Sequence, residues 1–137
     1  MASQPILDRQ MRSLGVEFSA SEMRYTILDS KNDNIRVIDS GRLKLTDTRD
    51  PGALRTFSTA VDAVLTSAAP NIVGIKLKPE SGNMRSGAAA LKMEGIFLSR
   101  LPCGVKFISG AKISKTFVPD SVKRYLSAAY AAASCAM

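Results

Sequence analysis

The amino-acid sequence predicts an α/β domain built on a mixed five-stranded sheet with helices on its faces. First, three strand-like segments follow one another within residues 13–45, close enough for an antiparallel meander. Second, helix-like and strand-like patterns alternate from residue 50 onwards, which gives the order βββαβαβα. The length of 137 residues fits one domain. We expect that domain to span residues 12–137, after a flexible tail at residues 1–11.

The first three strands show period-two alternation. Residues 13–18 and 23–29 alternate apolar with polar side chains and contain β-branched and aromatic residues, as strands do. Residues 30–34 are a polar cluster typical of a turn. Residues 35–45 form the third expected strand, with Ser40 and Gly41 as a candidate bulge.

The pattern then changes to a helical period. Apolar residues from Leu54 to Leu65 recur at spacings of three and four, so they share one helical face. Asp50 or Thr48 is the expected N-cap, and Pro51 suits the first turn. The sequence Ala69-Pro70-Asn71 ends this helix.

Two further strands and two helices are expected in the second half. Residues 72–77 begin with an apolar run typical of a buried parallel strand, and residues 104–108 form the fifth strand. A helix over residues 86–101 places Leu91, Gly95 and Leu98 on one face. Residues 110–115 are expected to form a basic loop. The last helix follows Pro119, with Asp120 as its N-cap.

Composition excludes several classes of function. No apolar run reaches the roughly 18 residues of a transmembrane helix, and residues 1–13 do not resemble a signal peptide, so we expect a cytoplasmic protein without a membrane partner. The sequence contains no histidine, which removes Ser-His and Cys-His nucleophile systems and His-ligated zinc. Cys103 and Cys135 have no ligand spacing and are expected to be buried, reduced thiols.

The positive charge lies in one half of the chain. Residues 1–75 contain nine Lys or Arg and nine Asp or Glu, whereas residues 76–137 contain ten basic residues against Glu80, Glu94 and Asp120. A basic surface attracts phosphates over long distances, so nucleic acid or another polyanion is one expected partner. A solvated surface without a ligand is the alternative.

Some motifs resemble a known family. Gly15-Val16-Glu17 resembles the first hairpin of the ribonuclease-H-like superfamily, which includes Holliday-junction resolvases. The stretch Ile75-Lys76-Leu77-Lys78-Pro79, followed by Gly87-Ala88 and Leu91-Lys92-Met93-Glu94, resembles a small bacterial domain of unknown function regarded as ribonuclease-H-like. The resemblance runs from about Leu14 to Thr116 and implies this fold without an assigned activity.

The resemblance also implies where metal ligands would lie. Nucleases of the superfamily hold divalent metals with one acid in the first strand, one at the end of the fourth, and one or two in the last helix. Glu17 occupies the first position, but residues 75–78 contain no acid, a departure even from the uncharacterised family. Glu80 in the following loop and Asp120 complete the candidate catalytic set. We expect no cofactor, or Mg²⁺ or Mn²⁺ if the protein is a nuclease.

Glu17 is the least ordinary acid in the sequence. It lies between Val16 and Phe18 in a strand that should be buried, where a carboxylate needs a partner. Three interpretations stay open: an ion pair with Lys76 or Lys78 in place of a metal, exposure at the strand end, or a metal ligand. Glu94 is expected to be a solvated or locally paired helix residue.

Six basic residues are candidate phosphate or nucleic-acid ligands: Lys76, Lys78, Arg85, Lys92, Lys112 and Lys115. The segment from Ser81 to Ala88 joins a strand to a helix, a geometry that directs backbone N–H groups at an anion, although a plain flexible connection fits equally. Tyr25, Tyr125 and Tyr130 are few for base stacking, and the Phe residues fit the core. Contacts to phosphates are therefore expected rather than contacts to bases.

Three functions remain after these arguments. The first is a non-catalytic ribonuclease-H-like module that binds nucleic acid or another partner through its basic half. The second is a metal-dependent nuclease with a displaced site formed by Glu17, Glu80 and Asp120 or Glu94. The third is a homodimeric scaffold in which the Ala-rich last helix packs against a second copy.

Overall fold

The fold was determined as a computed structural model that describes residues 10–79, 82 and 87–137. Its elements follow the predicted order, with two short additions before the last helix: β1 Gln10–Ser19, β2 Glu22–Lys31, β3 Asn34–Lys44, α1 Pro51–Ala68, β4 Ile72–Lys76, α2 Ala88–Ser99, β5 Gly104–Ile108, α3 Gly110–Lys115, η2 Arg124–Leu126 and α4 Ser127–Ala136. β1 begins at Gln10, two residues before the expected domain boundary.

The five strands form one mixed sheet in the order β3-β2-β1-β4-β5. β1, β2 and β3 pair antiparallel as the predicted meander, and β4 and β5 add in parallel to β1. Asn32 and Asp33 form the tight β2–β3 turn with positive φ angles of 51° and 70°. The β-bulge lies opposite Ile27 and Leu28, at the level of Ile38, and not at Ser40 and Gly41 as predicted. Gly41 instead lies against the Tyr25 ring.

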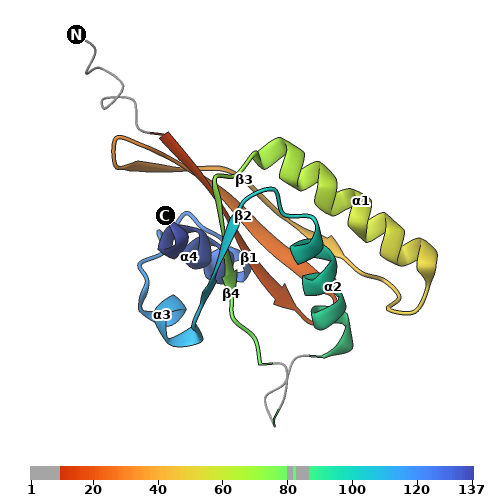
Figure 1. The fold of residues 1–137 in the computed structure, drawn as a ribbon. Helices are drawn as coiled ribbons and strands as arrows, with labels where there is room; N and C mark the ends of the chain where they lie inside the picture. The colour runs from red at the N-terminus through yellow and green to blue at the C-terminus, as the bar shows by residue number, and fades with distance from the viewer. Residues whose placement is uncertain (1–9, 80–81, 83–86) are drawn as a thin grey trace.

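Helices cover both faces of the sheet (Figure 1). α1 and α2 cover one face, where even-numbered β1 residues such as Leu14, Val16 and Phe18 join the main core. α4 covers the other face, where the Ser13 hydroxyl donates a 2.7 Å hydrogen bond to the Ala133 carbonyl. Because side chains alternate along a strand, Glu17 lies on the α4 face with Ser13 and Gly15.

Helix α4 lies unusually close to the sheet. A Cβ placed on Gly15 would lie 1.9 Å from the Ala129 carbonyl oxygen, and one on Gly74 would lie 2.1 Å from that of Ala132. Six of the ten α4 residues are buried, including Tyr130. The small residues of this helix therefore serve packing within the chain. Most of the Ala-rich surface that was expected to contact a second copy is buried within the chain, and the homodimer itself stays a prediction.

Caps define α1 as predicted. The Asp50 carboxylate accepts a hydrogen bond from the Ala53 amide at 3.1 Å, Pro51 opens the helix, and Ala69 ends it in the left-handed conformation. In α2 the buried residues are Ala90, Met93 and Phe97, so the buried face is not the one that Leu91, Gly95 and Leu98 share. The apolar residues of α2 lie on all sides of the helix, so helical periodicity alone could not identify the buried face.

The segment before α4 also differs from the prediction. The expected basic loop at residues 110–115 is helix α3, capped by the Ser109 side chain, which accepts from the Lys112 amide. Helix α4 begins at Ser127 after a 3₁₀ turn, so Asp120 lies in an exposed turn and is not its N-cap. No helix in the described part of the chain combines the length and hydropathy of a membrane span.

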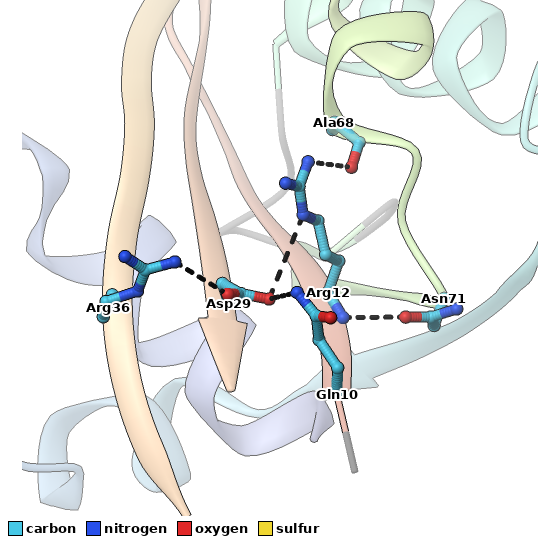
Figure 2. Close-up of polar contacts among 6 residues, drawn as sticks. All are labelled: Gln10, Arg12, Asp29, Arg36, Ala68 and Asn71. Carbon is cyan, nitrogen blue, oxygen red and sulfur yellow. Dashed lines mark hydrogen bonds and ion pairs between the residues drawn. The ribbon is translucent and has the colours of Figure 1, made fainter. Parts of the chain in front are cut away.

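A buried carboxylate joins three strands at the opposite end of β1 from Glu17. Asp29, 1 % exposed, accepts hydrogen bonds from Gln10 and Arg36 at 3.1 Å and lies 4.0 Å from Arg12 (Figure 2). Arg12 also donates to the Ala68 carbonyl at the end of α1. The hydrogen bond from Gln10, and then that from Arg36, hold the pKa of Asp29 below its usual value. This network fixes the α1–β4 connection to the sheet.

Candidate functional site

The predicted ion pair of Glu17 is present. Glu17 and Lys76 lie on neighbouring strands because Val16 pairs with Ile75 across the parallel β1–β4 contact. The Lys76 ammonium donates to Glu17 Oε2 at 3.2 Å. Arg24, directly opposite Glu17 on β2, lies 3.7 Å from Oε1. Both carboxylate oxygens therefore face cations, and Lys76 rather than Lys78 is the partner.

The charged row continues across the sheet. Arg42 lies opposite Arg24 on β3, and Glu22 accepts from Arg24 at 3.1 Å and lies 3.7 Å from Arg42. The guanidinium carbons of Arg42 and Arg24 lie 4.9 Å and 5.9 Å from the centre of the Tyr125 ring. Cation–π contact with the ring orients both arginines. Four neighbouring strands thus present an alternating ionic row on the α4 face.

Part of this row forms the floor of a hollow of about 430 Å³ between the sheet, α3 and the start of α4. Glu17, Arg24 and Lys76 line it from the sheet, and Arg124 and Tyr125 line it from the 3₁₀ turn. The other lining residues are small or apolar: Ile113, Ser114, Thr116, Val118, Ser127 and Ala128. Among the described residues that line the hollow, Glu17 is the single acid, and Arg24, Lys76 and Arg124 are cations.

The donor set does not fit a divalent metal. Mg²⁺ and Mn²⁺ require several converging oxygen ligands, and the described residues contain no group of three acid, cysteine or histidine side chains that could hold an ion. Two like unit charges about 4 Å apart repel by roughly 4 kcal/mol at an effective dielectric constant of about 20. The repulsion energy between a unit charge and a divalent ion of the same sign is twice as large. Lys76 and Arg24 would both impose that repulsion on a metal beside Glu17.

The other candidate acids do not join Glu17 in the described structure. Asp120 lies in the exposed turn before η2 and does not line the hollow. Glu94 lies in α2 and lines a different hollow, with Lys78 and Leu98, on the α2 side of the sheet. Glu80, the third predicted ligand, lies outside the described residues.

The predicted basic residues divide between the two faces. Lys76 lies in the hollow, and Lys112 and Lys115 are exposed on α3, whose Ile113 and Ser114 line it. Lys92 is on α2, where its ammonium donates to the Thr48 carbonyl at 2.7 Å. Because Lys78 also lies on the α2 side, these two residues do not join the others. Arg85, like most of the Ser81–Ala88 segment, lies outside the described residues.

Sequence reasoning missed Arg24 as part of the hollow. The signal that could have found it is the short turn of Ala20 and Ser21 between β1 and β2. A two-residue turn fixes the pairing of the two strands, and this pairing places Arg24 opposite Glu17. The prediction that the Phe residues fit the core is wrong for Phe107, which is 44 % exposed, and for Phe117, which is 80 % exposed.

Both cysteines are free, as expected, but they are half-buried and not buried as predicted. Burial raises the pKa of the Cys103 thiol, which lowers its thiolate population and hence its reactivity. Cys135 instead contacts the Thr116 hydroxyl at 3.1 Å. Neither lines the hollow, so the candidate site contains no thiol nucleophile among its described residues.

Comparison with solved structures identifies the fold. The chain is similar to Thermus thermophilus RuvC, with a TM-score of 0.70 at 12 % identity over 90 % of this chain and 91 % of RuvC. T. thermophilus RuvC in complex with a Holliday-junction substrate gives 0.66 at 14 % identity, with 90 % of each chain covered. The yeast mitochondrial Holliday-junction resolvase gives 0.51 at 11 % identity, covering 72 % of this chain and 50 % of the resolvase. These likenesses show a ribonuclease-H-like fold.

Sequence comparison gives the family. No curated protein matches the sequence. One family profile, described as "Protein of unknown function (DUF3010)", matches residues 11–134, which covers the sheet except Gln10, and α4 up to Ser134. The resemblance predicted from residues 14–116 is thereby confirmed, and the chain belongs to the DUF3010 family.

Proposed function

We propose that this protein is a non-catalytic ribonuclease-H-like module that binds nucleic acid through the α4 face of its basic second half. The observation on which the proposal depends is the pairing of Glu17 with Lys76 at 3.2 Å and with Arg24 at 3.7 Å. The acid of the first strand is neutralised by fixed cations, which occupy the space where a metal would coordinate it. The same cations give the hollow an excess of positive charge.

The basic residues around the hollow suit a polyanion. Lys112, Lys115, Lys123 and Arg124 are exposed, and none forms an ion pair with an acid within the described residues. Unpaired cations on one surface attract a phosphate backbone and release its counterions on binding. One of the similar structures above is in complex with a Holliday-junction substrate and another is a Holliday-junction resolvase, which makes a nucleic-acid partner consistent with the fold.

Salt-dependent binding tests the proposal. We expect a fluorescently labelled DNA junction to bind with a logarithmic affinity that falls linearly with the logarithm of the salt concentration. The double variant Lys112→Ala/Lys115→Ala should reduce the slope by about two, roughly one for each phosphate that the variant no longer neutralises. The control Lys31→Ala/Lys92→Ala removes the same net charge from other positions and should leave the slope unchanged.

Two results would overturn the proposal. One is the absence of salt-sensitive binding to DNA and RNA. The other is cleavage of a branched DNA or an RNA–DNA hybrid in Mg²⁺ or Mn²⁺ that disappears in Glu17→Gln, which would instead establish the nuclease with a displaced carboxylate site.

A further inference from the structure

Phe117 is the most exposed large apolar side chain in the described structure. It is 80 % exposed, whereas the other exposed large apolar residues range from 39 % for Ile38 to 53 % for Leu77. It lies between α3 and the 3₁₀ turn, in the segment that closes one side of the hollow. An exposed aromatic ring loses the burial free energy that a core position would provide, so its position requires an explanation.

The ring is held outward by its neighbours. The Thr116 hydroxyl donates to the Lys112 carbonyl at 2.7 Å and contacts the Cys135 sulfur. Val118 packs against the buried residues of α4, and the Val122 amide bonds to the Pro119 carbonyl at 3.0 Å. Because both flanking residues are anchored inward, Phe117 faces solvent as part of a fixed backbone.

The segment around Phe117 is mainly cationic, with Asp120 as its one acid between Thr116 and Leu126. Thr116 and Val118 line the hollow that also contains Lys76, Arg24 and Arg124, so Phe117 belongs to the wall segment of this hollow, with its ring on the solvent side. Lys115 precedes Phe117 by two residues, and Lys123 and Arg124 follow within the same segment. A planar apolar ring among cations matches a ligand with planar rings and regularly spaced negative charges.

We infer that Phe117 stacks on an unpaired base of a nucleic acid whose phosphates contact the cations of the hollow. This inference rests on the proposed function and specifies its ligand class. In a duplex both faces of each base are already stacked, whereas a single strand or a junction offers a free base face. The protein therefore binds single-stranded or branched nucleic acid more tightly than a perfect duplex.

An anionic lipid surface is the competing ligand, since it also combines negative charge with apolar contacts. The shape of the site favours nucleic acid. Lys76 and Arg24 form the floor of a hollow that a flat bilayer cannot enter, whereas a flexible phosphate backbone can follow it. A single aromatic ring also supplies little apolar area for insertion into lipid.

Variants at Phe117 test the inference in the full chain. The probes are a labelled oligothymidylate of about 16 nucleotides, a hairpin duplex and vesicles of phosphatidylserine and phosphatidylcholine. We expect Phe117→Ala to weaken oligothymidylate binding roughly 5- to 150-fold, with an unchanged salt slope. Phe117→Tyr should retain affinity within about twofold, and Phe117→Leu, which is apolar but cannot stack, should resemble Ala. Phe107→Ala is the control, because Phe107 is half-exposed on the α2 side.

The outcomes separate this inference from the proposed function. Wild-type protein that binds with a salt slope, together with an unaffected Phe117→Ala, overturns the stacking role and leaves the proposed function standing. The stacking role is also overturned if Phe117→Ala weakens binding to the hairpin duplex as much as binding to the oligothymidylate. Binding of the wild-type protein to vesicles without binding to the oligonucleotide overturns it as well. Failure of the wild type to bind any nucleic acid overturns both. Thermal unfolding of each variant verifies that the fold is retained.

Discussion

Glu17 Oε2 lies 3.2 Å from the Lys76 ammonium, across the parallel contact between β1 and β4. Arg24 approaches the other oxygen from β2, so one carboxylate lies between two cations on the α4 face. The carboxylate is largely shielded from solvent, and such a charge needs partners of opposite sign. The ionic row therefore compensates the shielded charge of Glu17 at the centre of the sheet, and its cations disfavour a metal ion at the same position.

The first prediction concerns divalent cations. Wild-type protein should unfold at the same temperature in Mn²⁺ and in chelator, because Lys76 and Arg24 repel a cation from Glu17. Lys76→Glu places a second carboxylate beside Glu17 and should create a Mn²⁺-dependent increase in stability. At a Mn²⁺ concentration of about ten times its Kd, the free energy of unfolding of this variant should increase by about 1.4 kcal/mol. Differential scanning fluorimetry with and without Mn²⁺ measures both effects.

Lys76→Gln is the matched control, since it removes the cation without adding an acid. It should show no comparable gain from Mn²⁺. A wild-type increase in Mn²⁺ as large as that of Lys76→Glu would contradict the assignment, because it would mean that a metal site exists despite the cations.

The second prediction concerns the contact between β1 and α4. Gly15→Ala places a methyl group 1.9 Å from the Ala129 carbonyl oxygen, a backbone atom that cannot move without displacing the helix. We expect a loss of about 4 kcal/mol or more, enough to unfold a marginally stable domain. Urea unfolding followed by circular dichroism measures it.

Gly95→Ala provides the control for that substitution. Nothing lies within 4 Å of a Cβ at this position in α2, and alanine has the higher helix propensity. We expect Gly95→Ala to increase the free energy of unfolding by about 1 kcal/mol. Similar stabilities for the two alanine variants would show that α4 does not approach β1 as closely as the structure places it.

Local signals explain why most of the fold could be predicted. Alternation in β1 and β2, the cap Asp50 and the apolar run of β4 each act through a few neighbouring residues, so the sequence contains them directly. Glu17 was also predictable, because an acid in a buried alternating strand requires a partner and the topology places β4 beside β1.

The remaining features depend on packing that the sequence pattern does not contain. Helix α3 has only six residues, too few for a helical period, and the local cap signal at Asp120 precedes a turn instead of α4. Asp29 resembles an ordinary strand-end acid until the register places Gln10 and Arg36 around it. Phe117 is apolar, and composition alone assigned it to the core.

The third prediction follows from the buried Asp29. Its pKa lies below the value in an unfolded chain, so the carboxylate contributes stability at pH values above about 3.9, and this contribution is lost as the pH falls through the folded-state pKa. Asp29→Asn should lower the free energy of unfolding at neutral pH by about 1–3 kcal/mol, and the difference from wild type should shrink in acid. Urea unfolding at pH values from neutral to acidic measures this.

Asp33→Asn is the control for the charge change. Asp33 is exposed in the β2–β3 turn at a φ of 70°, a conformation that asparagine also adopts. We expect Asp33→Asn to change the free energy of unfolding by no more than about 0.5 kcal/mol, with no dependence on pH in the range in which Asp29 is protonated. A deficit of Asp29→Asn that is independent of pH would show that shape rather than charge matters at that position.

The last prediction concerns a buried hydroxyl on β2. Thr26 is 1 % exposed, lies between Gly15 on β1 and Ser40 on β3, and its Oγ1 has no hydrogen-bond partner among the described residues. An unsatisfied buried hydroxyl is unfavourable by about 1–3 kcal/mol, whereas valine has a similar shape and the same preference for strands. Thr26→Val should therefore increase the free energy of unfolding by about 1 kcal/mol. Thr26→Ser, which keeps the hydroxyl and loses the methyl group, should decrease it. A lower stability for Thr26→Val than for wild type would mean that an ordered water satisfies this hydroxyl under α4.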